Sequence, residues 1–161
     1  LTQISHRNLI GQSGCFKFGG DRITEYMAEK LSLSVKEAKM LKEKYGMDNE
    51  PTFKVNVYNN LTIKDISSTI KEAVDQFCAL MGVFGSNLAV NILSRGGVYI
   101  AGGIVPRFVE YFKNSTFRAN FENKGRYSDI LKKIPVYVIS AQDAGLLGAG
   151  AYIRQELGAT L

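Results

Sequence analysis

The stretch R-G-G-V-Y-I-A-G-G-I-V-P-R, residues 95–107, decides the fold that we expect for this chain. Its centre, Val98 to Ala101, carries no charge and lies between two glycine pairs, which is typical of a short buried strand between turns. The second pair, Gly102 and Gly103, directly follows the strand. Because glycine has no Cβ, a flat ring or a phosphate can approach its backbone closely. A plain turn from strand to helix also explains the glycines, so both interpretations stay open at this point.

Length, composition and charge limit the class of protein. With 161 residues, of which 45% are hydrophobic, the chain is long enough for one core and a small second lobe. The net charge is +5, but the lysines alternate with acidic residues along helical patterns, which indicates solvated helix faces and no nucleic-acid partner. Two distant cysteines without a signal-peptide pattern indicate reduced thiols in a cytoplasmic protein. A single histidine speaks against a metal site or a catalytic triad.

The first sixty residues or so predict strands and a pair of helices. Short apolar alternations in residues 1–18 indicate the strands of a hairpin or a sheet edge. Asp21 is expected to cap a helix, and Ser34 with Glu37 three residues later forms a capping box for a second one. The two helices should form a hairpin. Alternation over residues 53–57 predicts a further strand.

A long helix is expected next. From Asp65 to Leu88 the apolar residues recur every three or four positions, which is the spacing of a helix with one buried face. Between residues 77 and 105 the only charge is Arg95, a pattern that a membrane span would share. Interior glycines and the change to a strand at Val98 favour a helix buried against a sheet, so no membrane partner is expected.

The rest of the chain alternates between helix and strand. A helix should begin at Pro106, a strand should occupy residues 134–139, and a final helix over residues 144–157 should pack its small residues against a neighbouring helix. This alternation predicts an α/β fold with a mostly parallel sheet flanked by helices. The uncharged strand 98–101 should lie centrally and be buried on both faces. Ligands of such sheets bind beyond the carboxyl ends of the strands, where residues 102–103 lie.

Five segments of the second half carry its most characteristic residues. They are F-C-A-L-M-G-V-F-G-S-N-L-A-V-N (77–91), G-G-V-Y-I-A-G-G-I-V-P-R-F (96–108), F-R-A-N-F-E-N-K-G-R (117–126), I-P-V-Y-V-I (134–139) and G-L-L-G-A-G-A (145–151). In this order and spacing they resemble the C-terminal part of bacterial glucokinases, over residues 73–161. The resemblance implies a kinase of glycolysis that transfers a phosphoryl group from ATP to glucose, with Mg²⁺ supplied by the complete enzyme.

Residues 1–70 resemble a different family. The segments F-G-G-D-R-I-T-E-Y-M-A-E-K-L (18–31) and S-V-K-E-A-K-M-L-K-E-K-Y-G (34–46) are similar to the actin-like ATPases of cell division and type IV pilus assembly. Both families belong to the superfamily of actin, sugar kinases and heat-shock chaperones, which implies a ribonuclease-H-like α/β lobe with a small α+β subdomain. The expected division is edge strands in residues 1–20, a helical-hairpin and strand subdomain in 21–64, and the glucokinase-like lobe in 65–161.

The superfamily resemblance also implies a nucleotide cleft. Its adenosine motif, whose backbone lies against the nucleoside, matches Gly102, Gly103 and Ile104, and Arg107 lies within reach of the same ligand. We therefore expect adenine nucleotide as a partner, bound at this turn. Glucose is expected to bind only together with an N-terminal lobe, and a homo-oligomer stays open.

Two lysines complete the implied site, and several motifs are missing from it. In the actin-like members a Glu and a Lys three residues apart contact the ribose; Lys42 matches the Lys, whereas Lys39 departs from the Glu. A solvated lysine face explains both residues equally well. The first phosphate loop and the sugar-binding Asn-Asp and Glu-x-x-His residues have no counterpart, and the second phosphate loop would lie before Leu1. No catalytic residue or metal ligand is therefore assigned.

Three functions remain open from the sequence. The chain is the C-terminal lobe of an ATP-dependent glucokinase that is inactive alone, or an actin-like ATPase lobe that acts as a filament or scaffold module, or a stable fragment without activity. The second half favours the first function, and the helical hairpin of residues 21–46 favours the second.

Overall fold

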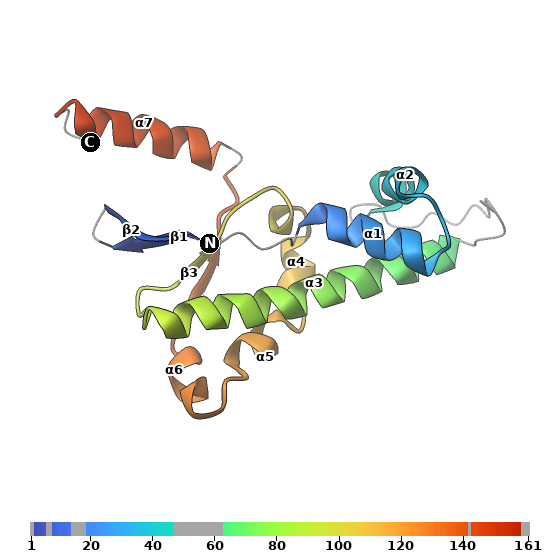
Figure 1. The fold of residues 1–161 in the computed structure, drawn as a ribbon, viewed down its shortest axis with the longest axis horizontal. Helices are drawn as coiled ribbons and strands as arrows, with labels where there is room; N and C mark the ends of the chain where they lie inside the picture. The colour runs from blue at the N-terminus through green and yellow to red at the C-terminus, as the bar shows by residue number, and fades with distance from the viewer. Residues whose placement is uncertain (1, 6–7, 14–18, 47–62, 142, 159–161) are drawn as a thin grey trace.

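The computed structural model describes residues 2–5, 8–13, 19–46, 63–141 and 143–158. The strand expected at residues 53–57 lies outside these ranges. The elements in chain order are β1 (Thr2–Ser5), β2 (Asn8–Ser13), α1 (Gly20–Lys30), α2 (Val35–Tyr45), α3 (Ile63–Asn91), β3 (Val98–Ile100), the 3₁₀ turn η1 (Val105–Phe108), α4 (Val109–Lys113), α5 (Phe117–Glu122), the 3₁₀ turn η2 (Gly125–Tyr127), α6 (Ser128–Leu131), β4 (Val136–Val138) and α7 (Ala144–Glu156) (Figure 1).

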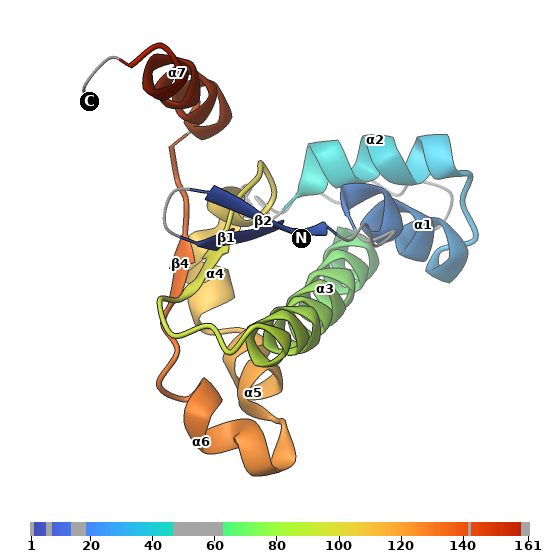
Figure 2. The same cartoon turned by 60° about the vertical axis from the view of Figure 1, so that its left-hand side comes forward.

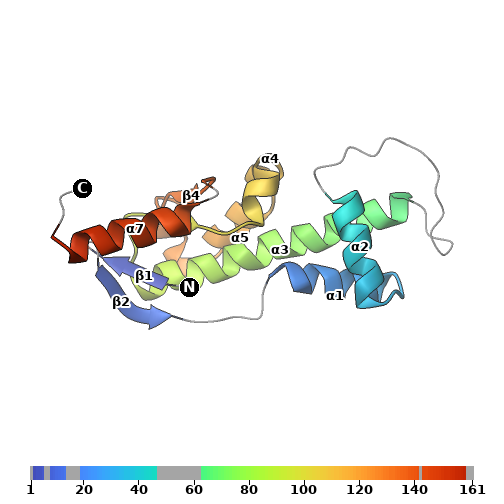
Figure 3. The same ribbon diagram turned by 90° about the horizontal axis from the view of Figure 1, so that it is seen from above.

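The long helix α3 is the axis of the fold, as its apolar period predicts. The buried stripe along it consists of Ile66, Ile70, Ala73, Val74, Phe77, Cys78, Ser86 and Ala89. The α1–α2 hairpin lies along its N-terminal half, whereas α5 and α6 lie below its C-terminal half (Figures 1 and 3). Each large apolar side chain removed from water on this stripe contributes about 1.5–3 kcal/mol to stability, so the stripe holds both groups of helices to one core.

A glycine explains why α5 approaches α3 so closely. A Cβ built at Gly82 would lie 2.9 Å from the backbone nitrogen of Phe121 and would overlap the carbonyl oxygen of Phe117. The missing side chain therefore lets the α5 backbone rest directly on α3. Phe121 is fully buried there, and Phe117 stacks against it with ring centroids 5.8 Å apart.

The helical hairpin has one predicted cap and one unexpected one. The capping box at α2 is confirmed: Glu37 N donates to Ser34 Oγ over 3.3 Å, and Ser34 N donates to a carboxylate oxygen of Glu37 over 2.9 Å. The cap predicted for α1 is wrong. Gly19 occupies the N-cap and Asp21 lies in the first turn, where its negative charge still suits the positive end of the helix dipole.

The described strands form two small sheets. β1 and β2 pair antiparallel as the expected hairpin, and β3 pairs parallel with β4, so that Val98 lies opposite Val136. The burial predicted for both faces of residues 98–101 is wrong, because the strand ends at Ile100 and Tyr99 is 64% exposed. Successive side chains in a strand point to opposite faces. Val98 and Ile100 therefore face the helices, and Tyr99 stacks on Tyr137 on the uncovered face.

Helix α7 stands apart from the core. Figure 2 shows it beyond β1 and β2, away from α3, and none of its residues is buried. The packing against a neighbouring helix that its small residues predict is therefore absent among the described residues. α3, by contrast, is long and apolar enough to cross a membrane by length and composition. It is the central helix of this fold and packs mainly against the helices α1, α2 and α5, whereas the sequence predicted a helix buried against a sheet.

Candidate functional site

The turn that follows β3 is exposed to solvent. Gly102 has φ +122°, a backbone conformation that residues with a Cβ rarely adopt, which explains the glycine at this position. Gly103 lacks such a φ. Both glycines are exposed, and no atom lies within 4 Å of a Cβ built at either. A flat group could therefore lie directly on the backbone of this turn.

The start of α1 lies beside this turn, although some eighty residues separate them in sequence. A Cβ built at Gly20 would lie 3.8 Å from Lys42 Nζ and 3.9 Å from Ile104 Cδ1. Figure 1 shows the first residues of α1 next to η1. The fold thus brings three segments to one place: the beginning of α1, the middle of α2 and the glycine turn.

Lys42 is held by α1. Its ammonium donates to the carbonyl oxygen of Gly20 over 2.8 Å and to Thr24 Oγ1 over 2.5 Å. An ammonium group carries three N–H donors, so one remains that no described residue accepts. The ribose contact predicted for Lys42 is thus limited to one donor. The sequence analysis missed Gly20 and Thr24 in this role, since only the fold brings α2 against the start of α1.

The pKa of Lys42 depends on burial and on the charged residues around it. Its pKa is lowered from the ordinary value, mainly because burial removes water from the ammonium. Asp21 and Glu43 oppose this shift, whereas the positive charges of Lys39 and Arg107 add to it. Arg107 therefore lies close enough for its charge to act on Lys42. Two predicted site residues from distant parts of the chain, Lys42 and Arg107, thus form a positive edge, and the carboxylates of Asp21 and Glu43 lie next to it.

This arrangement can bind and orient a ligand, and it places the carboxylates of Asp21 and Glu43 near the ammonium of Lys42. Open backbone at Gly102 and Gly103 suits a flat ring, and the positive edge suits a polar or anionic group attached to that ring. Of the residues predicted for the site, Lys42 and Ile104 both lie close to Gly20, and the charge of Arg107 acts on Lys42. Gly102 and Gly103 directly precede Ile104 in the same turn. Within the ranges given above, no three His, Cys, Asp or Glu side chains cluster as a metal site would require.

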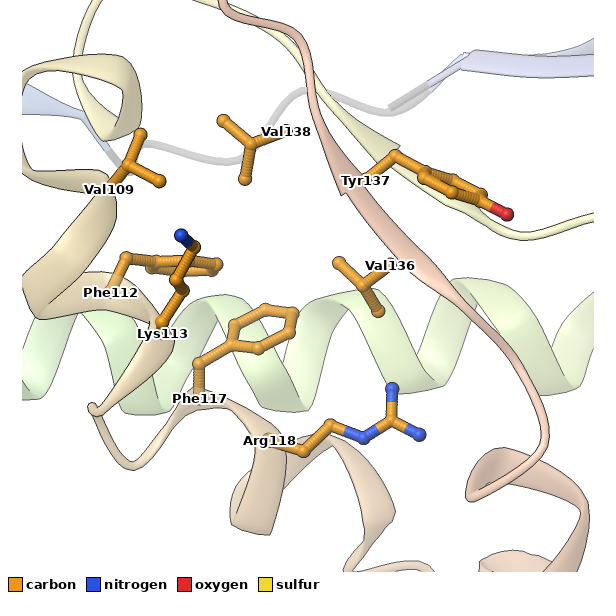
Figure 4. A pocket seen from close by; sticks show the side chains of 8 residues that line it. All are labelled: Val109, Phe112, Lys113, Phe117, Arg118, Val136, Tyr137 and Val138. Atoms are coloured by element: carbon orange, nitrogen blue, oxygen red, sulfur yellow. The ribbon is translucent and has the colours of Figure 1, made fainter.

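A hollow lies between α4, α5 and β4 (Figure 4). Its volume is about 460 Å³, and it is lined by Val109, Phe112, Lys113, Phe117, Arg118, Val136, Tyr137 and Val138. Val136 and Val138 point from β4 toward the two phenylalanines, whereas Tyr137 points away.

The cations of this hollow are already engaged. Arg118 donates to Glu122 and to the carbonyl oxygens of Leu131, Lys132 and Ile134, and Lys113 pairs with Glu110 over 2.7 Å. Arg118 therefore ties α5 to the segment before β4. The hollow is a packing feature beside the core, and the glycine turn remains the candidate site.

Comparisons with known proteins identify relatives of this chain. The family model described as Glucokinase matches residues 35–156. The curated glucokinase of Yersinia enterocolitica is 59% identical over 99 residues, which are 62% of this chain and 31% of that protein. The glucokinase of Yersinia pestis strain Pestoides F is 58% identical over 96 residues, or 60% of this chain and 30% of that protein. The chain thus spans about a third of the length of these relatives.

A solved structure agrees with the fold. The crystal structure of a glucokinase from an Antarctic psychrotroph matches 83% of this chain and 45% of its own, with a TM-score of 0.52 and 22% sequence identity. At this identity the match supports the α/β fold alone. The family match begins at residue 35, so it includes α2, which lies in the part that resembles the actin-like ATPases.

Proposed function

The chain belongs to the glucokinase family, and we propose that it forms the C-terminal, nucleotide-binding lobe of an ATP-dependent glucokinase. The open glycine turn carries this proposal. Adenosine lies against the bare backbone of Gly102 and Gly103, next to Ile104, and the positive edge of Lys42 and Arg107 faces the ribose and phosphate side of the nucleotide. ATP supplies the phosphoryl group that such an enzyme transfers to glucose in the cytoplasm as a step of glycolysis.

This lobe contributes nucleotide binding and not the reaction itself. Phosphoryl transfer requires a positioned γ-phosphate, Mg²⁺ and a base for the sugar hydroxyl, and the described residues form no cluster of His, Cys, Asp or Glu side chains that could hold a metal ion. We assign glucose and Mg²⁺ binding to the complete enzyme. The purified chain is expected to show no glucose-dependent ATP turnover in a coupled assay. Turnover at typical kinase rates, about 1–100 per second, would contradict the proposal that this lobe binds nucleotide without catalysing the reaction.

The actin-like filament or scaffold function is not favoured. The helical hairpin suggested it, yet the family match includes α2, the second helix of that hairpin. The resemblance of residues 1–70 to the actin-like ATPases is then a likeness within the same superfamily.

Titration with ATP tests the proposal. Wild-type chain should bind ATP weakly, with amide shifts confined mainly to residues 102–107, and Gly103→Val should abolish binding because the new side chain occupies the nucleoside position. Gly96→Val is the matched control, since Gly96 is also exposed, has no positive φ and has no atom within 4 Å of a built Cβ. The control should bind like wild type. Thermal unfolding of each variant identifies any loss of binding that follows from loss of fold.

The variant Lys42→Ala tests whether the positive edge contributes to nucleotide binding. If the remaining N–H group of Lys42 donates a hydrogen bond to the ribose, Lys42→Ala should lose about 0.5–1.5 kcal/mol of binding free energy. Lys39→Ala should lose less. Because Lys42 also holds α1, unfolding must be measured alongside. If wild-type chain shows no shifts at residues 102–107 in millimolar ATP, the glycine pair is only a structural turn and the proposed function is wrong for this chain.

A further inference from the structure

The glycine turn is exposed to solvent. No atom lies within 4 Å of a Cβ built at Gly102 or Gly103. Two elements flank the turn and fix where it begins and ends. On one side β3 is fixed by its pairing with β4, and on the other side η1 and α4 continue from Val105 to Lys113.

The downstream flank is attached to α3 by specific contacts. Tyr111 Oη donates a short hydrogen bond to Asp75 Oδ1, which joins α4 to α3. Phe108 places its ring edge-on to that of Phe77, with centroids 6.5 Å apart. Tyr111 lies in α4, four residues after Arg107 in η1, and Phe108 joins the two elements with a non-helical backbone of φ −140° and ψ 41°. A contact at Tyr111 therefore fixes α4 on α3, and the short link through Phe108 connects α4 to the segment that carries Arg107 and the end of the glycine turn.

The Tyr111–Asp75 pair is one polar contact of this attachment, and its acceptor carries a charge. A hydrogen bond to an ionised group is shorter and stronger than one between neutral groups, and it requires a defined geometry. The edge-to-face contact of Phe77 with Phe108 adds apolar burial beside it. The hydrogen bond therefore distinguishes one placement of α4 on α3 from its neighbours.

We propose that the hydrogen bond between Tyr111 and Asp75 positions the glycine turn for nucleotide binding, which makes both side chains positioning residues of the site. Neither side chain touches the ligand. The identity of the ligand, a nucleotide, rests on the proposed function. The effect of the hydrogen bond on the position of the turn can be measured without any ligand.

The protonation of Tyr111 suits this role. Burial raises its pKa well above the ordinary value of 10, and the hydrogen bond to Asp75, the charge of Asp75 and the nearby Cys78 add to the shift. Because the folded-state pKa is the higher one, the stabilisation is fully present below pH 10 and is lost as the pH rises above it. The hydroxyl thus remains a donor throughout the neutral range. The difference in stability between wild type and Tyr111→Phe should stay constant from pH 7 to about pH 9 and shrink above pH 10.

Four variants test the proposal in the complete 161-residue chain. Tyr111→Phe removes the donor, Asp75→Ala removes the acceptor, and the double variant completes a thermodynamic cycle. Asp75→Asn keeps an acceptor oxygen and serves as the conservative rescue. Tyr127→Phe is the matched control, because the hydroxyl of Tyr127 makes no hydrogen bond to any described residue and Phe keeps the ring beside Arg126.

Two measurements are made on each variant. In the free chain, Tyr111→Phe and Asp75→Ala should shift or broaden the amide resonances of Gly102 and Gly103, and Tyr127→Phe should leave them unchanged. With ATP, the same two variants should weaken binding by about 2- to 10-fold, the range expected for one hydrogen bond. The double variant should bind no more weakly than either single one, and Asp75→Asn should bind nearly as wild type does.

The outcomes separate this inference from the proposed function. If the resonances and the affinity stay unchanged while the unfolding midpoint falls, the hydrogen bond has a purely structural role and the inference is overturned. If wild type binds no ATP but the glycine resonances move in Tyr111→Phe, the positioning of the turn stands and the proposed function fails.

Discussion

Helices α5 and α7 both lie in the part that matches the glucokinase family, yet they differ in how the fold holds them. The shorter helix, α5, buries Phe117 and Phe121 and rests its backbone on α3. The longer helix, α7, buries nothing, and its Leu146 and Leu147 are 76% and 63% exposed. Length and apolar content therefore do not decide whether a helix packs against the core. Packing requires a surface on the core whose shape matches that of the helix.

Glycine has opposite consequences in the two regions. At Gly82 the missing side chain admits the α5 backbone, so the residue contributes to packing. At Gly145 and Gly148 in α7 no atom lies within 4 Å of a built Cβ, so these glycines allow no close contact. Their low helix propensity only destabilises α7. An isolated helix of this length is marginal in water. The stability of α5 thus comes from its contacts, whereas α7 depends on its own sequence.

The largest expected effect is at Phe121, which is fully buried between α3 and α5. Phe121→Ala should destabilise the chain by about 3–5 kcal/mol, since it removes a large apolar side chain and leaves a cavity. Urea unfolding followed by circular dichroism measures the change. Leu146→Ala in α7 is the comparison and should leave the midpoint unchanged. Equal losses in both variants would mean that α7 is part of the same cooperative core.

The next effect concerns the close approach itself. Gly82→Ala should destabilise by about 1–3 kcal/mol, because the methyl group overlaps backbone atoms of α5 that cannot move aside without separating the helices. Gly85→Ala is the control on the same helix. Its built Cβ meets the ring of Phe121 at 3.4 Å, close to ordinary contact, so only the gain in helix propensity, about 0.5–1 kcal/mol, should remain. A stable Gly82→Ala variant would show that α5 sits less tightly on α3 than described.

The comparison also shows what the sequence could predict. Features encoded by neighbouring residues were confirmed: the capping box of Ser34 and Glu37, the helical period of α3 and the strand that begins at Val98. Features that depend on distant contacts were wrong. The burial of Tyr99 required a layer on the second face of β3, and the packing of α7 required a neighbouring helix, and local patterns report neither.

The same division applies to the candidate site. The glycine turn was visible in the sequence because Gly102 and Gly103 directly follow the uncharged strand pattern of residues 98–101. The contacts of Lys42 with Gly20 and Thr24, and that of Tyr111 with Asp75, join residues at least eighteen positions apart. Only the fold brings such pairs together, so no spacing rule could have identified them.

The smallest expected effect is at Gly148, and it distinguishes α7 from α5 most clearly. Gly148→Ala should favour the helical state of α7 by about 0.5–1 kcal/mol, because alanine has the higher helix propensity and the new methyl group meets no atom within 4 Å. Since α7 shares no buried contact with the core, this gain should remain local. Carbon chemical shifts of residues 144–156 should move toward helical values, while the urea midpoint of the whole chain stays where it was. Gly85→Ala provides the reference for a glycine inside the core. If the midpoint rises together with the helicity of α7, the helix unfolds with α3 and α5, and the contrast between a helix held by its contacts and one that depends on its own sequence is wrong.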